Sequence, residues 1–159
     1  MNWEKLTIKA QEAVSEAQKK AESSNHQGID NEHLLYALVT QKDGTVKPIL
    51  DKLGANSGAI LKDLEKYLKN ITAVHGSAQV YITPRMKQTL DTAFIEAERL
   101  KDEYVSTEHL LISIADTGNG AAERVLQGQG VTKDRIYSVL KDIRGTQRIT
   151  DQAPEEKYQ

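Results

Sequence analysis

The sequence predicts an all-α fold of eight helices, arranged as two pseudo-symmetric four-helix repeats. The main observation is an internal sequence repeat: Glu32-His33-Leu34-Leu35 recurs as Glu108-His109-Leu110-Leu111, 76 positions later. The same offset relates Leu6-Thr7 to Ile82-Thr83, so the two repeats align without a gap. Composition agrees, because hydrophobic residues make up 38% of the chain but aromatic residues only 5%. An aliphatic, alanine-rich core favours helices, whereas strands favour β-branched and aromatic residues.

The first repeat is expected at residues 1–71 and begins with a helix capped by Thr7. Alanine and valine follow at the i, i+3, i+4, i+7 spacing of one helix face, at Ala10, Ala13, Val14, Ala17 and Ala21. A second helix is expected from Asp30, its N-cap, to about Thr40. Ile29 and Leu34 flank that cap at the spacing of a hydrophobic staple.

Two further helices complete the first repeat. A short helix should end just before Gly54, because glycine is favoured directly after a helix C-terminus. The last helix is amphipathic, and its apolar face is formed by Ile60, Leu61, Leu64, Tyr67, Leu68 and Ile71. Residues 72–81 are then expected to link the two repeats.

The second repeat, expected at residues 82–144, has the same signals. Thr83 precedes Pro84, which suits the first position of a helix because its missing N–H has no partner there. Ser106 is expected to cap the next helix, and Gly130 to follow the third. The fourth carries Ile136, Tyr137, Leu140 and Ile143 on one face. Residues 145–159 have little apolar periodicity, so we expect a disordered tail or linker outside the core.

Composition and charge exclude several functional classes. The 21 basic and 23 acidic residues leave a net charge of −2, whereas nucleic-acid binders usually carry a basic face. There is no cysteine to form a disulfide or to ligate a metal. Nothing approaches the roughly 18 apolar residues of a membrane helix, and the N-terminus lacks the basic and apolar regions of a signal peptide. We therefore expect a cytoplasmic protein that contacts neither nucleic acid nor membrane.

No motif in the sequence indicates catalysis. The pairs Glu32-His33 and Glu108-His109 cannot converge on one metal ion from a regular helix, because adjacent residues point about 100° apart. Packing or capping is the preferred role for these histidines, and we expect no metal site. The phosphate-binding motif G-x-x-x-x-G-K-[ST] is absent, so the chain should bind no cofactor and should not hydrolyse ATP. A binding domain that is monomeric in isolation is the expected alternative to an enzyme.

Two isoleucines interrupt the polar faces of their helices. With 100° between successive residues, Ile8 lies roughly 160° from the apolar stripe of its helix, and Ile95 roughly 180° from that of its own. Each either packs against the opposite repeat or the linker, or forms an exposed apolar contact for a partner. Both are candidate binding residues.

The paired repeats resemble the Clp N-terminal repeat, the domain that precedes the ATPase rings of the Hsp100/Clp chaperones. The resemblance rests on Leu6-Thr7 and Ile82-Thr83-Pro84-Arg85 at the starts of the repeats and on the doubled Glu-His-Leu-Leu. It covers about residues 2–144. The endings Arg144–Gln152 and Pro154–Gln159 resemble the exit from this domain in the ClpB disaggregases.

The resemblance implies a mobile substrate-recognition domain on a hexameric, ATP-driven ring. Its partners would be unfolded or aggregated proteins, with an Hsp70 system acting through the parent protein. Thr7, Asp102 and Glu108 match positions associated with substrate engagement, while Glu96 and His109 place polar residues where the family has an apolar groove. Each of the first three also has a structural interpretation: Thr7 as an N-cap, Glu108 at a helix N-terminus, and Asp102 as a surface loop acid. The alternative is an adaptor-binding domain of a ClpC/ClpA-type unfoldase.

Overall fold

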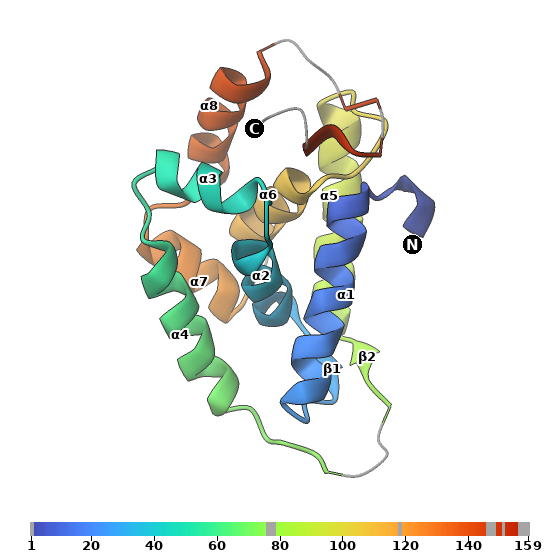
Figure 1. The fold of residues 1–159 in the computed structure, drawn as a ribbon, viewed down its shortest axis with the longest axis vertical. Coiled ribbons are helices and arrows are strands. Elements are labelled where there is room, and N and C mark those ends of the chain that lie inside the picture. The colour runs from blue at the N-terminus through green and yellow to red at the C-terminus, as the bar shows by residue number, and fades with distance from the viewer. Residues whose placement is uncertain (1, 76–78, 118, 146–148, 151, 156–159) are drawn as a thin grey trace.

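Figure 1 shows the fold, taken from a computed structural model that describes residues 2–75, 79–117, 119–145, 149–150 and 152–155. Within these residues the chain forms eight α-helices, which confirms the predicted all-α class. In order they are α1 (Ile8–Ser23), α2 (Asn31–Thr40), α3 (Val46–Lys52), α4 (Ser57–Lys69), α5 (Pro84–Arg99), α6 (Thr107–Thr117), α7 (Ala121–Gly128) and α8 (Lys133–Arg144). A short 3-10 turn at Trp3–Lys5 precedes α1.

The helices form three layers, and the middle layer is a pair of helices. Helices α2 and α6 lie in the middle, α1 and α5 lie on one side, and α3, α4, α7 and α8 lie on the other (Figure 1). Eight of the ten residues of α2 are buried, and α6 is buried from Thr107 to Ala115. A helix that is buried all round belongs in the centre of a protein. The Glu-His-Leu-Leu motifs begin these two central helices.

Three helix ends confirm their predicted caps. The Thr7 side chain accepts a hydrogen bond from the Ala10 N–H at 3.1 Å, and Thr83 does the same for the Met86 N–H, also at 3.1 Å. Asp30 begins α2 and accepts from the Asn31 N–H at 2.7 Å. Each such cap satisfies one backbone donor that the first helical turn leaves without a partner.

The backbone repeats as the sequence does. Residues with positive φ occur at three pairs of positions related by the 76-residue offset: Asn25 and Lys101, Asp43 and Asn119, and Gly54 and Gly130. The two glycines follow α3 and α7 with φ of 75° and 72°, as expected for left-handed residues just beyond a helix C-terminus. The repeats therefore share their turns as well as their helices.

The structure adds two short parallel pairings that the sequence did not predict. Strand β1 (Gly28–Ile29) pairs with β2 (Tyr81–Ile82), with Ile29 opposite Ile82. At the other end of the layer, Leu6 forms a parallel bridge with Val105. The 76-residue offset relates Leu6 to Ile82 and Ile29 to Val105, so the two pairings are equivalent with the repeats exchanged. Each repeat therefore contacts the other in the same way. This exchange is the signature of a pseudo-twofold axis between the repeats. The expected linker at residues 72–81 also loses its last residue, because Tyr81 lies in β2.

The prediction that residues 145–159 stay outside the core is wrong for the described part of this segment. The side chain of Ile149 is fully buried, and its backbone N–H and C=O bond to Asp102 and Glu103. Glu155 is also fully buried. Two buried apolar residues, Ile149 and Pro154, and one buried carboxylate form no periodic pattern, which is why the sequence did not reveal this packing. Residues 146–148, 151 and 156–159 lie outside the described residues.

Candidate functional site

The structure divides the five candidate residues into two groups. Ile8 and Ile95 are exposed, with 48% and 54% of their surfaces accessible, and their role as an apolar contact for a partner stays a prediction. Thr7, Asp102 and Glu108 are instead buried. No substrate can touch these three side chains while the fold is arranged in this way.

The two exposed isoleucines lie toward the same end of the molecule. Ile8 is the first residue of α1, and Ile95 lies near the end of α5. The Leu6–Val105 bridge holds the residues just before α1 against the loop that follows α5. The two helices run in opposite directions (Figure 1). Both isoleucines therefore lie on the side of their helices' mid-points that is nearer to this bridge.

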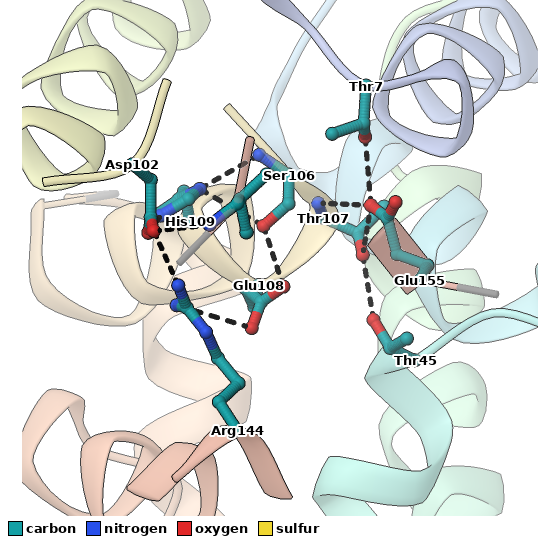
Figure 2. A network of polar contacts seen from close by, with 10 residues as sticks. Thr7, Thr45, Asp102, Ser106, Thr107, Glu108, His109, Arg144 and Glu155 are labelled. Carbon is teal, nitrogen blue, oxygen red and sulfur yellow. Dashed lines mark hydrogen bonds and ion pairs between the residues drawn. The ribbon is translucent and has the colours of Figure 1, made fainter. Parts of the chain in front are cut away.

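Asp102 is a buried ion-pair partner, so its expected placement as a surface loop acid is wrong. Its carboxylate accepts hydrogen bonds from His109 Nε2 at 2.8 Å, from the Arg144 guanidinium and from the Ile149 N–H at 2.8 Å (Figure 2). Burial alone would raise the pKa of Asp102, but these donors bring it below its ordinary value. The loop folds inward because α8 and the tail both supply donors to this carboxylate.

The hydrogen-bond network fixes the tautomer of His109. Its Nδ1 accepts from the Ser106 N–H at 2.8 Å, so in the neutral ring the proton lies on Nε2, which faces Asp102. The imidazole thus links the start of α6 to the loop after α5. This arrangement confirms capping and packing as the role of the motif histidine.

Glu108, the residue before His109, belongs to the same network. Its Oε1 accepts from the Ser106 hydroxyl at 2.8 Å, and its Oε2 lies 3.8 Å from Arg144 Nη1. Burial raises the pKa of Glu108 above its ordinary value, although His109 and Arg144 oppose the shift. Its place in the first turn of α6 also lets the helix dipole offset part of the cost of burial.

Thr7 contacts a residue that the sequence analysis missed. Its hydroxyl donates to Glu155 Oε2 at 2.8 Å, and the same oxygen accepts from the Thr107 N–H at 3.3 Å. The Thr107 hydroxyl also lies 2.8 Å from that of Thr45 (Figure 2). Burial raises the pKa of Glu155. Nothing in the sequence marks Glu155, because its partners lie at least 48 residues away in the chain.

The first repeat contains a matching but different network. The offset maps Asp102 onto His26 and His109 onto His33, whose Nδ1 and Nε2 atoms are 2.9 Å apart. His33 Nδ1 accepts from the Asp30 N–H at 2.9 Å, as His109 does from Ser106. Desolvation, followed by the repulsion from His26, lowers the pKa of His33 to about 4. One repeat thus buries a pair of neutral imidazoles where the other buries an ion pair.

Glu96 and His109, the two polar positions in the expected groove, also face inward. Glu96 is buried and pairs with Lys133 at 2.8 Å and Arg99 at 3.2 Å, and it accepts a hydrogen bond from the Tyr137 hydroxyl. These contacts tie α5 to α8. Neither residue lines an open apolar groove.

Comparison with known proteins identifies the domain. The model of the Clp repeat N-terminal domain matches residues 5–129. The chain belongs to the Clp N-terminal repeat family. It is 37% identical over 156 residues to the chaperone protein ClpB of Rhodopirellula baltica, a match that covers 98% of this chain and 18% of that protein. ClpB of Bacillus cereus is 35% identical over 163 residues, covering 100% of this chain and 19% of the relative. The chain therefore spans less than a fifth of these relatives.

Solved structures confirm the fold of the Clp N-domain. The Hsp104 N-terminal domain from Candida albicans superposes with a TM-score of 0.81 at 18% identity, covering 94% of this chain and 98% of that one. The N-terminal domain of ClpV1 from E. coli gives a TM-score of 0.77 at 18% identity, covering 96% and 92%. Within the described residues, no helix is both long and apolar enough to cross a membrane. The same residues contain no cluster of three or more His, Asp or Glu side chains that could hold a metal ion.

Proposed function

We propose that this chain is the substrate-recognition domain of a ClpB-type disaggregase, which binds unfolded or aggregated polypeptides and delivers them to the pore of a hexameric ring. The observation that carries this proposal is the exposure of Ile8 and Ile95 at one end of a Clp N-domain. Unfolded chains expose apolar side chains, and two accessible isoleucines on a folded scaffold offer them a contact.

Such binding should be weak. Fully burying an isoleucine contributes about 1.5–3 kcal/mol, and both side chains are already half-buried in the free domain. Association costs about 4–15 kcal/mol in lost translational and rotational freedom. Two isoleucines alone do not offset this cost, so a substrate must add backbone contacts. Weak capture suits a domain that has to release its substrate to a pore.

A related domain supports peptide binding by this fold. A ClpV N-domain, solved in complex with a VipB peptide, superposes on this chain with a TM-score of 0.68 at 12% identity. The relatives named above are ClpB chaperones, which favours the disaggregase over the adaptor-binding alternative. In the proposed parent protein, ATP binds outside these residues, an Hsp70 system cooperates through other domains, and the protein acts in the cytoplasm.

Chemical-shift mapping tests the proposal. Titration of the 15N-labelled chain with a permanently unfolded, carboxymethylated protein should shift the amides around Ile8 and Ile95. The amides around Val74, an exposed apolar residue of the connection between the repeats, should stay in place and serve as the internal reference. Shifts confined to the Val74 region, or none at saturating protein, would exclude this end of the domain as the binding surface.

A further inference from the structure

The described tail residues 149–150 and 152–155, named the strap here, lie across the starts of α1 and α6 and the loop after α5. The Ile149 C=O accepts from the Glu103 N–H at 2.7 Å, and the Gln152 C=O accepts from the Ile8 N–H at 2.8 Å. The Ile149 N–H donates to Asp102 at 2.8 Å. On the strap side, all three bonds are made by backbone groups, the N–H and C=O of Ile149 and the C=O of Gln152. Another segment with a different sequence could therefore make the same bonds.

The strap also places a carboxylate at the junction of two helix N-termini. Glu155 Oε2 accepts from the hydroxyl of Thr7, the N-cap of α1, and from the N–H of Thr107, the first residue of α6. Figure 2 shows this carboxylate between the two helices. A carboxylate is favoured there because unpaired N–H groups and the positive ends of two helix dipoles converge on it.

The first repeat shows what this junction looks like when its carboxylate is built in. The offset maps Thr107 onto Asn31 and Thr7 onto Thr83. Asn31 N–H donates to Asp30 at 2.7 Å, and the neighbouring Thr83 side chain contributes to lowering the pKa of Asp30. The residue equivalent to Asp30 in the second repeat is Ser106, which has no carboxylate. Glu155 supplies it from the strap, 49 positions further along the chain.

Glu155 fills the junction imperfectly. Its Oε1 is buried and has no hydrogen-bond partner among the described residues. Burying a carboxylate oxygen in this way is unfavourable, because the lost hydration is not replaced. An incoming carboxylate with better geometry could therefore replace Glu155 without breaking a complete set of bonds.

We propose that the face beneath the strap is a binding site for a peptide that carries an apolar residue followed, six positions later, by a carboxylate side chain. The strap is its resident intramolecular ligand: Ile149 fills the apolar position and Glu155 the acidic one. The site deepens the proposed function, because the strap must leave before the backbone of Ile8 and the side chains of Thr7 and Asp102 can reach a substrate.

Competition by a free peptide tests the site. The probe is a fluorescent synthetic peptide with the sequence of residues 146–159, and the proteins are the unmodified chain and its Ile149→Ser/Glu155→Ala variant. The variant should bind the probe at least about tenfold more tightly, because apparent affinity is reduced by the fraction of protein whose site is free. A peptide carrying the same two substitutions should bind neither protein. Glu98→Ala, on the exposed surface of α5, is the control variant and should bind like the unmodified chain.

Equal affinity of the unmodified chain and a folded double variant would overturn the proposal. If the double variant does not fold, native-state hydrogen exchange of the unmodified chain decides instead. The amides of Ile8, Glu103 and Ile149 should then exchange by a local opening, at lower free energy than the Leu34 amide in the core. Exchange of all four only through global unfolding would show that the strap is a fixed part of the fold.

The same proteins separate this inference from the proposed function. Suppose the double variant binds the probe more tightly but neither protein shifts on titration with carboxymethylated protein; the strap site then stands and the proposed function fails. If both proteins bind the unfolded protein equally and the probe shows no gain, the function stands and the strap site fails.

Discussion

His26 and Asp102 occupy equivalent positions, yet they place opposite electrostatic surroundings beside the two buried motif histidines. In the second repeat the Asp102 carboxylate faces the N–H of His109 at 2.8 Å. In the first repeat His33 faces another imidazole at 2.9 Å, and a second positive charge there would meet repulsion and a desolvation cost. The pKa of His33 is accordingly lowered to about 4, first by burial and then by His26. A single substitution between the repeats therefore changes the charge that the buried motif tolerates.

The domain should lose stability in mild acid because of this histidine pair. The unfolded chain protonates His33 near its ordinary pKa of 6.5, whereas the folded chain does so only at about 4. As pH falls through that window the unfolded state binds more protons, so unfolding becomes easier, by on the order of 2–3 kcal/mol. Urea unfolding at intervals across the window measures this loss. His26→Asp, which copies the second repeat, should reduce it, and an unchanged slope in that variant would contradict the assignment.

Asp102 should be needed for folding, whatever else it does. Removing one partner of a buried ion pair costs about 3–5 kcal/mol, because it leaves a buried charge without compensation. We expect Asp102→Ala to lower the free energy of unfolding by this amount in urea titrations. Glu103→Ala, the exposed neighbour, should change it by no more than about 0.5 kcal/mol. Similar values for the two variants would mean that the Arg144 and His109 contacts contribute little.

At the scale of the helices, Ile8 combines an exposed side chain with a structural backbone. Its N–H bonds to the strap, but 48% of its surface is accessible. Ile8→Ser should therefore weaken capture of an unfolded protein while leaving the melting temperature nearly unchanged, since the backbone bond remains. Leu64→Ala, in the fully buried face of α4, should instead cost roughly 2–5 kcal/mol. Loss of stability in Ile8→Ser comparable to that of Leu64→Ala would place Ile8 in the core.

Local signals predicted the helices but could not predict what joins them. Caps such as Thr7 and Thr83, and glycines such as Gly54, act within one turn, so their roles follow from neighbouring residues. Strands β1 and β2 are two residues long, too short for any alternation. The strap is held by backbone hydrogen bonds, by the buried residues Ile149 and Pro154 and by one carboxylate, which no periodic pattern marks.

Of the candidate site, the sequence predicted the exposed residues but not the buried ones. The angular positions of Ile8 and Ile95 on their helices predicted that they interrupt a polar face, and both are accessible. Burial of Asp102 depends on Arg144, 42 residues away, and could not be inferred from the polarity of its loop. The 76-residue offset held a further signal for the burial of Asp102. It pairs Asp102 with a histidine of the first repeat, and histidine is more often buried than aspartate.

At the scale of the whole molecule, the pseudo-twofold arrangement makes each repeat depend on the other. The exchanged pairings of Ile29 with Ile82 and of Leu6 with Val105 cross between the repeats. Arg85 of the second repeat forms a two-point ion pair with Asp30 of the first, at 2.6 and 3.1 Å. Helices α2 and α6 share one continuous core. Neither repeat has a complete hydrophobic interior of its own.

The two repeats should therefore unfold in a single cooperative transition. Leu35 and Leu111 are equivalent, fully buried residues of α2 and α6, and Leu→Ala at either should cost roughly 2–5 kcal/mol. Because both helices belong to one core, each substitution should lower the same calorimetric transition, with equal calorimetric and van't Hoff enthalpies. If Leu35→Ala instead separated a first transition from a second at the original temperature, the repeats would be independent folding units. The exchanged strand pairings would then join two finished domains, and a substrate bound between Ile8 and Ile95 would contact a hinge rather than a rigid surface.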